Sequence, residues 1–121
     1  MEMLTKAAWI GLAAIHAMPS LALFMPSLIQ RLYGVPSSGS VGILLTHRGA
    51  LFLGVFALAL LATFDEQSRR AGVLVVGISM IGFLIVYANA GSPAGALRTI
   101  ALTDLVGLPL LALVTWEALQ R

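Results

Sequence analysis

Six polar side chains interrupt the long apolar stretches of this sequence, and their types are those that do chemistry inside membranes. They are His16, His47, Arg48, Asn89, Arg98 and Asp104. A charged side chain at the centre of a bilayer costs about 2.5–3.5 kcal/mol on insertion scales, so such residues normally face other helices and have partners there. Asp104 is the most informative of the six, because its short side chain cannot easily reach water as a long basic side chain can.

The favoured arrangement is an ion pair between Asp104 and Arg48, with Arg98 as the second candidate for the cation. Pairing removes the cost of isolating either charge in hydrocarbon. The two histidines and the asparagine are expected to flank this pair, which leaves a wet or ligand-filled recess open towards one membrane face. Two alternatives remain open: the pair only holds helices together, as polar groups between membrane helices can do, or it lines an ion or proton path.

Several other chemistries lack their residues. The chain has no cysteine, which excludes disulfides, thiolate catalysis and thiolate-bound metals. The motifs HExxH, GxxxxGK[ST] and GxSxG do not occur, so the corresponding zinc, phosphate-loop and serine-hydrolase sites are not expected. The seven Lys and Arg residues are scattered, and no nucleic-acid partner is expected. No cofactor is predicted, although His16 and His47 supply the minimum pair of ligands for a haem held between helices.

The composition indicates that the surrounding solvent is lipid. Hydrophobic residues make up 60% of the 121 residues and charged residues only 10%, against about 45–50% and about 25% in an ordinary globular domain. Mean hydropathy is +1.00. Seven basic and five acidic side chains cannot cover the surface of a soluble domain of this size. We therefore expect an all-α integral membrane protein.

The spacing of the polar segments divides the chain into four apolar stretches. A helix needs about 20 mostly apolar residues to cross the hydrocarbon, and turn or charged residues separate the stretches at 33–40, 65–70 and 89–96. The prediction is a single four-helix transmembrane domain over residues 1–121, with spans at about 4–24, 42–64, 71–90 and 98–118.

The first apolar run is too long for one simple span, and two prolines interrupt it. Pro19 and Pro26 each remove a backbone donor and clash with the preceding turn. We expect a short second helix over Pro26–Tyr33 with Gly34 as its C-terminal stop, lying at the membrane surface because its apolar and polar residues fall on opposite sides. The alternative is a continuous, kinked first span that runs to Tyr33.

Four spans place both termini on one side of the membrane. The basic residues Lys6, Arg69, Arg70 and Arg121 fall on that side, and Arg31, Arg48 and Arg98 fall on the other. This four-to-three count favours cytoplasmic termini under the positive-inside rule. Trp9 and Trp116, near the terminal ends of their spans, are interpreted as interfacial anchors. The pair Ala50 and Gly54 would permit close helix packing, within one chain or between copies.

Four segments of the chain are similar to those of a known group of proteins. They are LIQRLYGV (28–35), THRGALF (46–52), the DEQSRR turn (65–70) and AGSPAGALRTIALTDLVGLP (90–109). With the four-span layout, they resemble the small bacterial four-helix membrane proteins of the broadly DoxX-like type. The resemblance implies a four-helix bundle in a bacterial inner membrane. It carries over no catalytic residue, but links of the wider group to quinone or redox partner complexes give weight to a quinone-like or lipid ligand.

The sequence as a whole predicts a small integral membrane protein that binds a lipophilic ligand, lipid or quinone-like, or acts as an accessory membrane subunit. The six polar residues named at the outset are the expected lining of its recess. One alternative is a membrane enzyme on an isoprenoid, sterol-like or quinone substrate, with His47 or His16 as general acid–base. A second is an oligomeric transporter or channel. A homo-oligomer and a complex with a partner membrane protein are both left open.

Overall fold

Residues 1–120, the part of the chain that the computed structural model describes, form helices and no strand. The elements are α1 (Glu2–Leu21), α2 (Ser27–Tyr33), α3 (Gly39–Phe64), the 3-10 turn η1 (Glu66–Ser68), α4 (Arg69–Asn89) and α5 (Ala96–Leu119). The all-α class expected from the sequence is confirmed. The long helices begin and end within three residues of the four expected ranges.

Three helical segments are long and apolar enough to cross a membrane: Gly39–Phe64, Glu66–Asn89 and Ala96–Leu119. At 1.5 Å per residue, even 24 residues extend about 36 Å, which exceeds the roughly 30 Å of a hydrocarbon core. Large apolar side chains on these helices point outward, as Leu44, Ile78 and Val106 do. The protein is therefore an integral membrane protein with transmembrane helices. α1 is shorter, at 20 residues, and is not one of these three segments.

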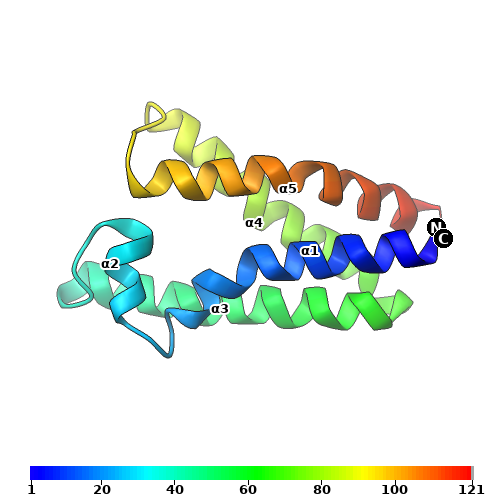
Figure 1. Cartoon of the computed structure of the whole chain (residues 1–121), viewed down its shortest axis with the longest axis horizontal. Coiled ribbons are helices and arrows are strands. Elements are labelled where there is room, and N and C mark those ends of the chain that lie inside the picture. The colour runs from blue at the N-terminus through cyan, green and yellow to red at the C-terminus, as the bar shows by residue number, and fades with distance from the viewer. Residues whose placement is uncertain (121) are drawn as a thin grey trace.

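The four long helices run alternately up and down (Figure 1). The start of α1, the end of α5 and η1 lie at one end of the molecule, while α2 and the α4–α5 connection lie at the other. α1 packs against α3 and α5, and α4 packs against α5 and α3. This arrangement brings the C-terminal part of α1 and the N-terminal parts of α3 and α5 together near α2.

The first apolar run breaks into two helices. α1 continues through Pro19 and ends at Leu21, and residues 22–26 form turns. α2 then begins after Pro26 and ends at Gly34, whose left-handed conformation (φ 72°) lets its N–H bond the carbonyl of Gln30. Glycine adopts this conformation without steric cost. The expected short helix is thus present, and the alternative of one continuous kinked helix to Tyr33 is wrong.

The core at the terminal end is built around Trp9, which is fully buried. Its ring fills space that α4 leaves open at Gly72, where an added Cβ would lie 2.7 Å from the indole. Ala59 and Ala62 of α3 belong to the same buried cluster. The interpretation of Trp9 as an interfacial anchor is therefore wrong, because small residues on the neighbouring helices leave space in the core that the ring occupies. Trp116 is 62% exposed, as an anchor requires.

Gly49 of α3 packs closely against the turn that follows α1. A Cβ on this α3 residue would lie 2.8 Å from the backbone nitrogen of Leu23. Gly54, by contrast, has open space where its Cβ would be. Close packing within the chain thus uses Gly49 rather than the predicted pair of Ala50 and Gly54.

Candidate functional site

Three of the six predicted polar residues line one small cavity under α2. They are His16 of α1, Arg48 of α3 and Asp104 of α5, and the cavity, here called the polar chamber, measures about 170 Å³. Leu32 of α2 forms part of the same wall. His16 and Asp104 are buried, with 2% and 7% of their surfaces exposed, and Arg48 is partly buried. The polar convergence expected from the sequence therefore involves three helices.

The other three predicted residues lie outside this chamber, and all are exposed. His47 is next to Arg48, but consecutive residues of a helix point about 100° apart, and it is Arg48 that faces inward. Asn89 is the last residue of α4. Arg98, in the first turn of α5, lines a separate cavity of about 490 Å³ with Tyr87.

Arg48 and Asp104 do not form the predicted ion pair. In the described part of the chain, no hydrogen bond or ion pair joins Asp104 to Arg48 or to Arg98, although the charge of Arg48 acts electrostatically on Asp104. The guanidinium instead lies 4.7 Å from the ring centre of Phe52 and 5.7 Å from those of Tyr33 and Phe83. Cation–π attraction favours this position and holds the cation away from the carboxylate.

The Arg48 guanidinium keeps an unused donor in this aromatic setting. Its Nε is buried and has no hydrogen-bond partner. A buried N–H without an acceptor costs about 1–3 kcal/mol, and more when the group is charged. Cation–π contacts do not replace the missing acceptor, so Arg48 retains a capacity to bind an oxygen atom.

His16 connects three helices through its ring. Its Nδ1 lies 2.9 Å from the carbonyl oxygen of Leu12, and its Nε2 lies 3.0 Å from the hydroxyl of Ser79. Because a carbonyl only accepts, Nδ1–H donates to Leu12, and in the neutral ring Nε2 accepts the proton of Ser79. The ring also contacts Phe52 of α3, with centres 5.7 Å apart.

The residues do not fit a haem held by His16 and His47. Both ring nitrogens of His16 have protein partners, and His47 is on the exposed side of α3. Within residues 1–120, no group of three His, Asp or Glu side chains is placed to hold a metal ion.

A larger, mostly apolar cavity of about 600 Å³ lies between α3 and α4. We call it the apolar cavity. Its wall includes Ser79 and Phe83 of α4 and Tyr33 of α2, and it shares Arg48 and Phe52 with the polar chamber. Ligand cavities are typically about 300–1,000 Å³, lined by apolar and aromatic side chains with a few polar groups. The apolar cavity has this size and composition, and Arg48 stands between it and the polar chamber.

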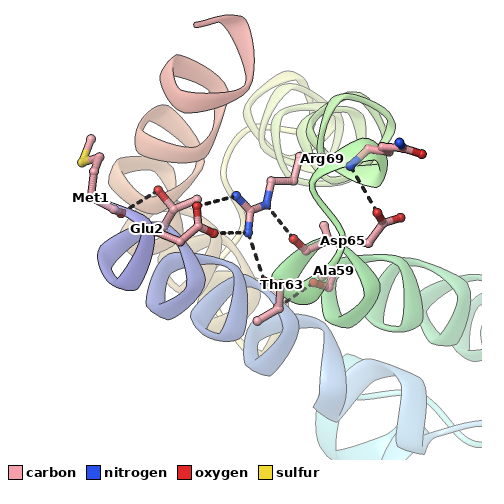
Figure 2. Close-up of polar contacts among 9 residues, drawn as sticks. Met1, Glu2, Ala59, Thr63, Asp65 and Arg69 are labelled. Atoms are coloured by element: carbon pink, nitrogen blue, oxygen red, sulfur yellow. Dashed lines mark hydrogen bonds and ion pairs between the residues drawn. The ribbon is translucent and has the colours of Figure 1, made fainter. Parts of the chain in front are cut away.

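Sequence reasoning missed a buried arginine at the opposite end of the molecule. Arg69, with 1% of its surface exposed, bonds the carbonyl oxygens of Ala62 and Thr63 through Nε and Nη2 at 2.8 and 3.1 Å. Its Nη2 also lies 2.7 Å from Oε1 of Glu2. Figure 2 shows this guanidinium between the start of α1 and the end of α3. The sequence does contain a signal for this contact, because an arginine that follows a short turn after a helix can bind the last carbonyls of that helix, which lack partners within it.

Comparison with protein-family models, curated proteins and solved structures finds no match. The class of protein that the fold defines is an integral membrane protein made of antiparallel helices. Within that class, the two adjoining cavities and the arginine between them are the features that bear on function.

Proposed function

We propose that this protein binds a lipophilic molecule, a lipid or a quinone-like compound, in the apolar cavity, with an oxygen of the molecule's polar group on Arg48. Such a protein could act alone or as an accessory subunit of a membrane complex. The observation that carries the proposal is Arg48, which lines a cavity of ligand size and whose buried Nε has no hydrogen-bond partner in the described part of the chain.

Energetics support this assignment. A guanidinium inside a membrane needs partners, and the three aromatic rings around Arg48 supply attraction but no acceptor. A phosphate, carboxylate or carbonyl oxygen would accept its N–H groups, and charge-assisted bonds of this kind are about twice as strong as neutral ones. The remaining wall, including Leu51, Val55 and Ile78, suits an acyl or isoprenoid tail.

In the proposed membrane placement, α1 is a fourth crossing and completes a four-helix bundle. Its 20 residues extend about 30 Å, the thickness of the hydrocarbon. α2 lies at the interface, with Leu28 and Ile29 buried and Gln30 and Arg31 exposed. We place the termini in the cytoplasm on the count of basic residues, and the protein in a bacterial inner membrane on its DoxX-like resemblance.

The test is purification without detergent, in native membrane discs, followed by mass spectrometry of the bound molecules. Wild-type protein should carry one species enriched over bulk lipid. Arg48→Gln should reduce that enrichment roughly tenfold or more, because a hydrogen bond to a charged group contributes about 1.5–3 kcal/mol. His47→Gln is the matched control, since it changes the neighbouring but exposed residue, and it should retain the ligand. Equal enrichment in the two variants, both folded by circular dichroism, would contradict the proposal.

A second candidate is the membrane enzyme, with His16 as the acid–base group. The observation in its favour is the contact of Nε2 with the hydroxyl of Ser79, a residue of the apolar-cavity wall. The bond to Leu12 fixes Nδ1 as the protonated nitrogen and leaves Nε2 as the base. If this is the function, His16→Gln should abolish turnover of the bound molecule while leaving its binding intact. Turnover that survives the substitution would exclude His16 as the base.

A further inference from the structure

The polar chamber contains two opposite charges that do not neutralise each other by contact. Arg48 reaches it from α3 and Asp104 from α5, and no ion pair joins them in the described part of the chain. Each charge would cost less if it had a partner of opposite sign. The chamber between them therefore has the charge pattern of a site for a molecule that carries both signs.

We propose that the bound molecule is a zwitterionic amphiphile, whose anionic group lies on Arg48 and whose primary ammonium group enters the polar chamber and donates to Asp104. This inference rests on the proposed function and specifies the chemical class of its ligand. The apolar tail occupies the apolar cavity, which adjoins the chamber through the shared wall of Arg48 and Phe52.

The hydrogen bonds already made in the chamber single out Asp104 as the acceptor for the ammonium. The hydroxyl of Thr103 donates to the carbonyl of Thr99, and His16 has partners at both ring nitrogens. The carboxylate of Asp104 has no hydrogen bond to the described residues, even though the residue is buried, with only 7% of its surface exposed. It is thus the acidic group of the chamber whose oxygens are available to an ammonium.

The size of the chamber fits a short polar arm. Its volume is about 170 Å³, roughly that of six water molecules at about 30 Å³ each. A two-carbon arm ending in an ammonium fits within this space, while a second acyl chain does not. The arm would pass Arg48, where the anionic group stays, and end near Asp104.

Electrostatics distinguish the zwitterion from simpler ligands. An anion without an ammonium is attracted by Arg48 but repelled by the Asp104 carboxylate. A cation without an anionic group is attracted by Asp104 but repelled by Arg48. A quaternary ammonium carries the positive charge but has no N–H to donate. A primary amine combined with a phosphate or carboxylate satisfies both side chains.

The test is competition among three lipids with identical acyl chains, measured by native mass spectrometry of the protein in discs of defined composition. The probes are phosphatidylethanolamine, phosphatidylglycerol and phosphatidylcholine. Wild-type protein should favour phosphatidylethanolamine over both others by about tenfold, the contribution of one charge-assisted hydrogen bond. Asp104→Asn should abolish this preference and shift binding towards phosphatidylglycerol. Arg98→Gln, which changes an exposed charge on the same helix, should keep it.

The outcomes separate this inference from the proposed function. If Asp104→Asn folds normally and keeps the wild-type preference, or if wild-type protein has none, the zwitterion is refuted. The proposed function survives that result as long as Arg48→Gln still loses the bound lipid. If Arg48→Gln binds like wild type, both proposals fail. Should Asp104→Asn not fold, Asp104→Glu, which retains the carboxylate, must preserve the preference for the amine.

Discussion

Replacing Arg69 by methionine should destabilise the protein more than the same substitution at the neighbouring Arg70. Arg69 ties the start of α1 to the end of α3 at the point where α4 begins. Methionine keeps an apolar stem of similar length, so the substitution removes the guanidinium and its bonds while it preserves much of the packing. The expected result is a lower free energy of unfolding with little change in helix content.

The magnitude follows from the bonds that Arg69 makes. Its guanidinium donates to the carbonyls of Ala62 and Thr63 at 2.8 and 3.1 Å and to the two oxygens of Glu2 at 2.7 and 3.3 Å. Removing one partner of a buried ion pair costs about 3–5 kcal/mol. The Glu2 side chain is 39% exposed and can be hydrated, so we expect the lower end, about 3 kcal/mol. Glu2→Gln keeps an amide oxygen that can accept one of these bonds but leaves the buried guanidinium without its counter-charge, so it should cost about 1–3 kcal/mol, at most as much as Arg69→Met.

The assay is unfolding in mixed micelles of dodecyl maltoside and SDS, followed by circular dichroism. Arg70→Met is the matched control, because Arg70 is exposed and its Nε reaches the Ala118 carbonyl at a longer 3.4 Å. The reasoning is refuted if Arg69→Met lies within about 0.5 kcal/mol of Arg70→Met, the usual range for surface substitutions.

Two further predictions concern packing and exposure to lipid. Gly49→Ala should lower the free energy of unfolding by about 1–3 kcal/mol, because the new Cβ would meet the backbone of Leu23 and overpacking forces backbone shifts. Gly54→Ala is the control and should cause no such loss, because open space surrounds its Cβ position. Equal losses for the two variants in the same micelle assay would contradict this packing. Brominated lipid should quench the fluorescence of Trp116, which is 62% exposed, far more than that of Trp9, which is fully buried. Single-tryptophan variants, Trp9→Phe and Trp116→Phe, measure each signal, and strong quenching of Trp9 would place it at the lipid surface instead.

The helices could be predicted from the sequence because hydropathy acts directly on them. An apolar stretch of about 20 residues reports the crossing of hydrocarbon whatever its neighbours are. The break after α1 and the end of α2 were equally accessible, since Pro26 and Gly34 restrict or permit particular backbone conformations. These are local effects, and they need no knowledge of how the helices pack.

The site could be predicted only in part, because it depends on the rotation of each helix about its axis. His47 and Arg48 are neighbours, and hydropathy alone does not decide which of them faces inward when the helix is apolar all round. The aromatic rings that hold Arg48 away from Asp104 come from three different helices. Trp9 was misplaced for a related reason, because the space that accepts it is created by Gly72, far away in the sequence.

The contact between Glu2 and Arg69 also constrains the order of events during synthesis. The two residues are 67 positions apart, so α1 emerges from the ribosome long before its partner is made. The ion pair between Glu2 and Arg69 can form only when α3 and the η1 turn are complete and α4 has begun. Until then the nascent α1 lacks this ion pair, and a chain that terminates before α4 has no Arg69 to bind the start of its first helix.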